Sequence, residues 1–231
     1  MCEMGNIKYL SDEEAKGAII DIGKRMYDKG FVASNDGNIS VKVAAHEIWV
    51  TPTGVSKGYM SEDMLVKLDL KGNILEGVLL PSSEIKMHLM VYSQSAEVMA
   101  VTHAHPPVAT SFAISGIELD SAVLPEAVVN LGVVHIAPYA TPGTQQVPES
   151  IKPFCRDFNA VLLANHGALT WGRDIYEAYY RLESLEHYAN ILMYSSRVLG
   201  NVNILSCEQV WELIKIRKSL GIKAGGVSKG K

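Results

Sequence analysis

Apolar side chains recur along the chain at two spacings, and each spacing predicts a different element. Ser11 and Glu14 form a capping-box pattern, and the apolar residues that follow at helical spacing up to Gly30 predict a first helix. Three short segments then alternate apolar with polar residues, as half-buried strands do: 39–43, 48–50 and 66–70. After the turn at 71–73, Ile74 and Leu75 are predicted to begin the returning strand of a hairpin. The first third of the chain is therefore predicted to be one helix followed by a meander of strands.

The rest of the chain mixes predicted helices and strands. An amphipathic stretch behind two serines predicts that a second helix begins at the pair Ser82-Ser83. Short apolar runs bounded by turn residues predict further strands at 98–102, 133–137 and 160–164, and helical spacing returns at 174–199 and 208–220. No repeat or linker divides the chain, so we expect one domain over 1–220 and a flexible tail, rich in Gly and Lys, at 221–231. Without regular alternation of strand and helix, this order favours a mixed or antiparallel sheet covered by helices.

Composition excludes several classes of function. A net charge of −4 over 231 residues leaves no excess of Lys and Arg for binding along a nucleic acid. No apolar run of about 18 residues could span a bilayer, and the N-terminus has no basic segment followed by an apolar one, so we expect a cytoplasmic protein with no membrane partner. The three cysteines, Cys2, Cys155 and Cys207, are too widely spaced for a disulfide framework or a metal knuckle.

Three histidines follow apolar strands and predict a metal site. His103 and His105 are two residues apart, so both side chains leave the strand on the same face, roughly 6 to 7 Å apart. His166 also ends an apolar run, and another strand of the same sheet could supply it as a third ligand. Three protein ligands and one open position are typical of catalytic zinc. A lone histidine is more often a hydrogen-bonded residue, so the prediction depends on all three.

A carboxylate and three loops suggest how a substrate is held. Glu84 follows Ser82 and Ser83 at the start of the second predicted helix, where it could be a simple electrostatic cap or could lie beside an anion bound by the helix start. Loops at 37–38 and 53–54 can turn backbone N–H groups toward the same anion. Together with the metal site, these loops predict a phosphorylated substrate held at one end and polarised by metal at the other.

Three neighbouring side chains are expected to have ordinary roles. His88 lies one helical turn after Glu84 and is predicted to pack or to form hydrogen bonds, because the other histidines offer better metal geometry. Lys57 and Lys86 are interpreted as solvated charges or, at most, as charges that attract phosphate.

The ordered set of motifs resembles the class II aldolase/adducin family over roughly residues 10–200. The motifs are Gly37-Asn38-Ile39-Ser40, Thr51-Pro52-Thr53-Gly54, Pro81-Ser82-Ser83-Glu84, His103-Ala104-His105, Ala137-Pro138-Tyr139 and Asn165-His166-Gly167. Within that family the chain is most similar to the L-fuculose-1-phosphate aldolases. The resemblance implies a three-layer α/β fold, with a central, mostly antiparallel sheet flanked by helices, assembled as a ring-like homotetramer with active sites between subunits.

The resemblance also implies a role for each motif residue. The metal ligands for one Zn²⁺ per subunit would be His103, His105 and His166, and Glu84 would be the acid/base and a fourth ligand before substrate binds. The phosphate ligands would be Asn38, Thr53, Gly54, Ser82 and Ser83. A ketose 1-phosphate, such as L-fuculose 1-phosphate, would be cleaved to dihydroxyacetone phosphate and a short aldehyde. Zinc would stabilise the enediolate, while Glu84 moves the proton on the nucleophilic carbon.

Departures from the family pattern leave alternatives open. The fuculose enzymes place a tyrosine from a neighbouring subunit before the Ala-Pro-Tyr motif, whereas residues 124–130 contain none. Glu126 either replaces that tyrosine as a second acid or simply begins a short helix with Pro125. Pentulose 5-phosphate 4-epimerases usually carry aspartate at the position of Glu84, which favours an aldolase. Methylthioribulose-1-phosphate dehydratases share the histidines and the glutamate and remain an alternative, whereas a non-catalytic adducin-like module would lack the metal set.

Overall fold

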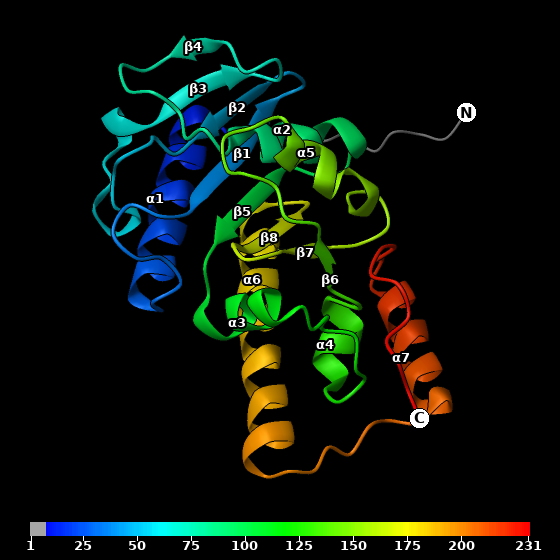
Figure 1. Cartoon of the computed structure of the whole chain (residues 1–231). Helices are drawn as coiled ribbons and strands as arrows, with labels where there is room; N and C mark the ends of the chain where they lie inside the picture. Colours follow the sequence, from blue (N-terminus) through cyan, green and yellow to red (C-terminus); the bar gives the residue numbers. More distant parts are fainter. Residues whose placement is uncertain (1–7) are drawn as a thin grey trace.

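One eight-stranded sheet forms the middle layer of the protein, between two groups of helices (Figure 1). The computed structural model describes residues 8–231. The strands are β1 (Asn38–Ala44), β2 (Glu47–Val50), β3 (Val66–Asp69), β4 (Ile74–Glu76), β5 (Ala100–Ala104), β6 (His135–Ala137), β7 (Ala160–Leu163) and β8 (Gly167–Gly172). Their order is β4-β3-β2-β1-β5-β8-β7-β6, and only β6 and β7 pair in parallel. The predicted three-layer α/β fold with a mostly antiparallel sheet is confirmed.

Seven α-helices lie within the described residues. They are α1 (Asp12–Asp28), α2 (Ile85–Gln94), α3 (Pro107–Ser115), α4 (Pro125–Asn130), α5 (Gln146–Ile151), α6 (Ile175–Met193) and α7 (Cys207–Ser219). The capping box of Ser11 and Glu14 is present at the start of α1, as the sequence predicts. The long helix predicted at 174–199 is α6 followed by one π-helical turn at Tyr194–Val198.

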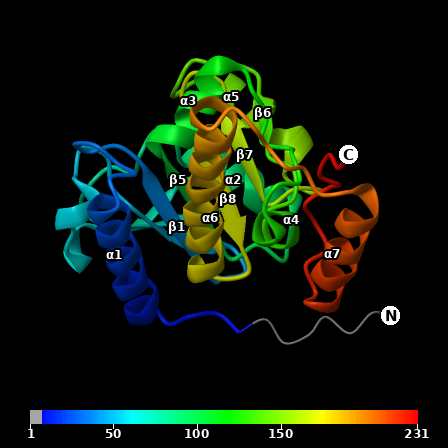
Figure 2. The same cartoon turned by 90° about the horizontal axis from the view of Figure 1, so that it is seen from below.

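Each face of the sheet has its own hydrophobic core. On one face, α1, α3 and α6 pack on side chains such as Ile39 and Leu162. On the other face, α2 and α5 pack on side chains such as Val101 and Leu169 (Figures 1 and 2). Because successive strand residues alternate between the two faces, every central strand is buried on both sides.

Burial on both faces corrects one expectation from the sequence. The alternation in β1 predicts a strand with one solvated face, but its polar residues Ser40 and Lys42 are buried. They lie on the face that α2 covers, since Ser40 bonds to two side chains of that helix. The sequence also gave no indication of β8 or α3, both of which border the candidate site.

The C-terminal tail runs along the body of the protein. The carbonyl of Gly225 accepts from the N–H of Val133 at 2.7 Å, and the N–H of Lys229 donates to the carbonyl of Asp120 at 2.6 Å. These bonds hold the tail more closely than its Gly- and Lys-rich sequence suggests. The division into a domain at 1–220 and a flexible tail stays a prediction.

Two further expectations concern cysteines and membranes. Cys155 and Cys207 are free thiols, and Cys2 lies outside the described residues. Among the helices of residues 8–231, none combines the length and the apolar character needed to cross a bilayer.

Candidate metal and substrate site

The three histidines meet where β5 and the β7–β8 turn end at the same edge of the sheet. His103 belongs to β5 and His105 follows it directly, so both rings lie on the face covered by α2. His166 occupies the tight turn between β7 and β8. Because β8 pairs with β5 and places Ala168 opposite Ala104, this turn ends beside His105. One nitrogen from each histidine falls within 4.8 Å of the others.

Glu84 completes the cluster from the helical layer. It is the N-cap residue of α2, one position earlier than the first helical turn in which the sequence places it, and its side chain makes no capping bond. Its Oε1 lies 3.0 Å from Nε2 of His166, and its Oε2 lies 3.4 Å from Nε2 of His103. The carboxylate therefore faces the same point as the three rings.

The ring orientations fit a divalent cation. Nδ1 of His103 donates to the carbonyl of Ala168 at 2.9 Å, and Nδ1 of His105 faces the carboxylate of Asp36 at 3.4 Å. Both rings therefore keep a lone pair on Nε2, and these two atoms are 3.2 Å apart. Two nitrogens bound at 2.0–2.1 Å to one tetrahedral zinc would be about 3.3 Å apart. Two facing lone pairs repel each other unless a proton or a metal cation lies between them, and their separation matches that of two zinc ligands, so the residues fit the metal.

Burial sets the charge of the cluster. The pKa of His103 falls to about 4 because its ring is fully buried, and burial also lowers the pKa of His105. Burial by itself would raise the pKa of Glu84, but His103, His166 and the Asn38 amide hold it well below its usual value. Neutral rings of His103 and His105 and an ionised Glu84 carboxylate are the protonation states that metal binding requires.

The three candidate phosphate loops converge beside Glu84. Pro52 and Pro81 form an isolated β-bridge, and the N–H of Thr53 donates to the carbonyl of Leu80 at 2.9 Å, so the loops at 51–54 and 81–84 lie side by side. The exposed residues of these loops are Thr53, Gly54 and Ser83. They could receive a phosphate from solvent next to the histidine cluster.

Asn38 has a different environment from the other candidate phosphate ligands. Its side chain is only 1% exposed, and its amide nitrogen donates to Oε2 of Glu84 at 2.8 Å and to Oγ of Ser82 at 3.3 Å. With both amide hydrogens engaged, the structure directs Asn38 toward Glu84 and leaves no donor for a phosphate.

The sequence suggested that Lys57 is a solvated charge, and the structure shows instead that its side chain is buried. It begins a short 3-10 turn at Lys57–Tyr59 and is 1% exposed. Its Nζ donates to the carbonyls of Asn35 at 3.0 Å and Val55 at 2.7 Å. Burial lowers its pKa to about 8, partly offset by the charges of Asp36 and Glu84. Lys57 thus joins the loop before β1 to the loop that contains Gly54.

Sequence reasoning missed several residues that orient the cluster. Asp36 faces His105, and the hydrogen bond predicted for His88 has a partner that the sequence did not name, Asn38 behind Glu84. A signal for the second contact exists, because Glu84, His88 and Tyr92 are spaced four residues apart and so share one face of α2. For Asp36, which lies in a turn, no such spacing is available.

Glu126 is separate from the cluster within this chain. It lies exposed in the first turn of the six-residue helix α4, after Pro125 at the helix start. Within residues 8–231 it makes no hydrogen bond or ion pair with the histidines or with Glu84. The helix-start interpretation of Pro125-Glu126 therefore describes its local structure.

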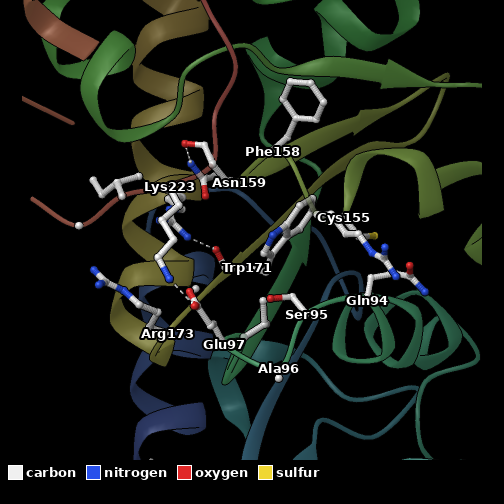
Figure 3. Close-up of a pocket in the computed structure, with 17 residues that line it drawn as sticks. Gln94, Ser95, Ala96, Glu97, Cys155, Phe158, Asn159, Trp171, Arg173 and Lys223 are labelled. Carbon is white, nitrogen blue, oxygen red and sulfur yellow. Dashed lines mark hydrogen bonds and ion pairs between the residues drawn. The ribbon is translucent and has the colours of Figure 1, made fainter. Parts of the chain in front are cut away.

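A cavity of about 400 Å³ lies at the ends of β5 and β8 that are opposite to the histidine cluster (Figure 3). Its wall includes Trp171, and its rim includes the ion pair of Lys223 with Glu97, whose atoms are 2.5 Å apart. None of the candidate site residues lines it. The chemistry of the site is therefore concentrated at the histidine end of the sheet.

Comparison with known proteins agrees with this arrangement. Residues 17–193 match the family described as Class II Aldolase and Adducin N-terminal domain. The L-fuculose phosphate aldolase of Methanocaldococcus jannaschii is 32% identical, with 77% of this chain and 95% of that protein covered. The 3-oxo-tetronate 4-phosphate decarboxylase of Haemophilus influenzae is 31% identical, with 79% of this chain and 88% of that protein covered.

The fold is also found in a solved structure of a related enzyme. An L-fuculose 1-phosphate aldolase superposes with a TM-score of 0.83 and 30% identity, with 91% of this chain and 98% of that chain covered. The segment that matches the family model, residues 17–193, contains every residue of the histidine cluster and the three adjoining loops. This chain belongs to the class II aldolase and adducin family.

Proposed function

We propose that this protein is a zinc-dependent aldolase that cleaves a ketose 1-phosphate, L-fuculose 1-phosphate or a similar sugar, to dihydroxyacetone phosphate and a short aldehyde. The main support is the carboxylate of Glu84, which lies 3.0 Å from His166 and 3.4 Å from His103 beside the exposed loops of Thr53 and Ser83. An acid/base next to a metal site and an anion site is the combination that this cleavage needs.

The histidines would hold the metal through their Nε2 atoms. In this proposal His103, His105 and His166 are the three permanent ligands, and Glu84 is the fourth until substrate arrives. Zinc, when bound, would polarise the substrate carbonyl and neutralise the negative charge that develops when the carbon-carbon bond breaks. The carbonyl of Ala168 and the carboxylate of Asp36 keep two of the rings turned toward that position.

Glu84 would transfer the proton. Its low pKa makes it a carboxylate at neutral pH, able to accept a proton from the substrate and to return it to the nucleophilic carbon. The N–H groups and side chains of Thr53, Gly54, Ser82 and Ser83 would hold the phosphate and so align the reacting carbon with Glu84. Asn38 would act on the carboxylate and not on the phosphate.

Glu126 is proposed as the second acid, supplied across a subunit interface. Its exposure on α4, without a hydrogen bond or ion pair to the histidine cluster among residues 8–231, is compatible with use by a neighbour in a homotetramer. Large exposed apolar side chains near the site loops, including Tyr59 and Leu80, offer surface for such an interface. The Glu126→Gln variant should lose aldol cleavage without losing zinc; undiminished cleavage would eliminate this role.

We also expect the enzyme to be cytoplasmic, where phosphorylated sugars are made and used.

Decarboxylation is the second candidate function. The similarity to a 3-oxo-tetronate 4-phosphate decarboxylase, at 31% identity over 79% of this chain, favours it. Loss of CO₂ from a phosphorylated 3-oxo acid leaves the same kind of negative charge on the carbon next to a carbonyl, so the metal and phosphate sites would serve both reactions. The two functions differ in the bond that breaks.

One experiment separates these candidates. Purified protein is analysed for metal and then assayed for dihydroxyacetone phosphate from L-fuculose 1-phosphate and L-ribulose 1-phosphate, and for CO₂ from 3-oxo-tetronate 4-phosphate, with and without chelator. About one zinc per chain and chelator-sensitive release of dihydroxyacetone phosphate would support the aldolase. Release of CO₂ alone would replace it with the decarboxylase, and zinc without either product would direct the search to epimerase or dehydratase substrates.

A further inference from the structure

A chain of four hydrogen bonds extends from Glu84 into the protein interior. Asn38 Nδ2 donates to Glu84 at 2.8 Å, and Asn38 Oδ1 lies 2.6 Å from Nε2 of His88. Nδ1 of His88 lies 2.7 Å from Oγ of Ser40, which lies 2.8 Å from the hydroxyl of Tyr92. All of the residues behind Glu84 are buried, and His88 is 0% exposed.

The direction of every bond follows from the carboxylate. Ionised Glu84 can only accept, so the Asn38 amide must present its nitrogen to Glu84 and its oxygen to His88. His88 must then donate from Nε2, which leaves Nδ1 to accept from the Ser40 hydroxyl. Ser40 in turn accepts from the hydroxyl of Tyr92. Only one proton arrangement satisfies the whole chain, and a neutral His88 is part of it.

The surroundings of His88 keep it neutral. Its ring is enclosed between β1 and α2, and burial lowers its pKa to about 3. A buried polar chain of this kind is favourable only when every member has a partner, and here every member does. The amide of Asn38 could otherwise rotate by half a turn, which would place its oxygen against the Glu84 carboxylate and repel it.

We propose that His88 is a positioning residue, which locks the Asn38 amide and thereby holds the Glu84 carboxylate in the orientation needed for proton transfer. The inference rests on the proposed acid/base role of Glu84. It assigns to His88 no contact with substrate or metal. Removal of the Nε2 donor should therefore slow turnover and leave the binding of zinc and of the substrate phosphate in place.

The test compares two replacements of His88 in the full-length, zinc-loaded protein. His88→Leu has no donor, whereas His88→Gln can still donate to Asn38 from its own amide. We expect His88→Leu to lower kcat about tenfold to a hundredfold, as a small misplacement of a reacting group does, with KM and zinc content changed less than about twofold. His88→Gln should recover most of that loss.

Two controls separate positioning from loss of stability. Val91→Ala weakens the same helix in the core, away from the chain of bonds, and should lower the melting temperature without the loss of kcat. His46→Gln changes an exposed histidine and should change neither quantity. If kcat followed the melting temperature across all four variants, His88 would be only structural and the inference would be wrong.

A double substitution tests the path through Asn38. Once Asn38→Ala has removed the amide, adding His88→Leu should lower kcat no further, because the two residues act in series. An equal loss in both backgrounds would overturn the inference. A different result would show that the proposed function itself is wrong: Glu84→Gln would then keep the full kcat, because Glu84 would not be the acid/base.

Discussion

Asn38 and His103 lie directly opposite each other in the antiparallel pair of β1 and β5. Both approach the same atom, Oε2 of Glu84, at 2.8 Å from the Asn38 amide and 3.4 Å from Nε2 of His103. A shift of one residue between these strands would turn one of the two side chains to the opposite face of the sheet. The register of two strands therefore determines where the proposed acid/base meets the proposed metal ligands.

Substitutions of His105 and Glu84 should separate metal binding from proton transfer. His105→Ala removes one of three ring ligands and should lose zinc and activity together. Glu84→Gln keeps the three rings and the shape of the side chain, so zinc should remain while kcat falls by about 10²- to 10⁴-fold. Metal analysis and initial rates on the same samples measure both effects. Full activity in either variant would contradict the proposed mechanism.

Two glycines with similar backbone conformations should respond differently to alanine. Gly37 has φ +73°, and a Cβ there would lie 2.8 Å from the carbonyl oxygen of His103 and 2.6 Å from Val32. Gly30 has φ +70° and open space around it. Gly30→Ala should cost only the left-handed backbone strain, about 1–2 kcal/mol. Gly37→Ala should cost more and should also weaken zinc binding.

Urea unfolding of both glycine variants, with a competition assay for zinc affinity, checks this expectation. Because the two φ angles are nearly equal, the difference between the variants reports the steric contact of the added methyl group with the strand that contains His103. Equal losses of stability, with equal zinc affinity, would mean that β5 can move away without disturbing the site.

Lys57→Met should weaken binding of the phosphorylated substrate. Within the described residues Lys57 has no carboxylate at ion-pair distance. Its buried positive charge is balanced by two carbonyls, by the more distant charges of Asp36 and Glu84 and, under the proposed function, by the substrate phosphate. We expect KM to rise about tenfold, with zinc content unchanged. Lys71→Met, at an exposed turn, is the matched control.

Inhibition by inorganic phosphate measures the same effect without turnover. Its inhibition constant should rise in Lys57→Met by a factor similar to that of KM and should stay constant in Lys71→Met. A variant with a normal KM and normal phosphate inhibition would limit Lys57 to joining the two loops.

Two fully buried histidines should make the metal-free protein sensitive to mild acid. His88 and His103 have pKa values of about 3 and about 4 in the folded protein, both lowered by burial from 6.5. Above pH 6.5 neither state binds these protons, and stability is unaffected. As the pH falls further, the unfolded chain takes up protons that the folded chain does not, so stability decreases until the pH reaches the folded values.

At pH 5 the loss should be about 2 kcal/mol for each of the two histidines. Urea unfolding of metal-free protein between pH 7 and pH 5 measures it. His88→Gln should remove about 2 kcal/mol of this dependence, because the replaced side chain no longer titrates, whereas His103 and His105 still do. A free energy of unfolding that stayed constant over this range would show that the two rings are less enclosed than the structure indicates.

Local patterns predicted those parts of the fold that depend on neighbours in sequence. The first helix and its capping box, the strands of the meander and the strand before His103 follow from spacing and turn residues alone. In contrast, β8 escaped prediction because both of its faces are buried, so apolar and polar residues do not alternate along it. Helix α3 begins against the carboxylate of Glu186, which accepts from Val108 and Ala109, and a cap so distant in sequence leaves no local signal.

The candidate site shows the same division between sequence and structure. The sequence by itself determined the residue types: a His-x-His pair, a third histidine before glycine, and a glutamate behind two serines. Tertiary structure alone decided that Asn38 faces Glu84, that His88 lies behind it and that Lys57 is buried. The physical reason is that donors, acceptors and burial are set by strands and helices that meet only after the chain has folded, whereas ligand identity is a property of each side chain.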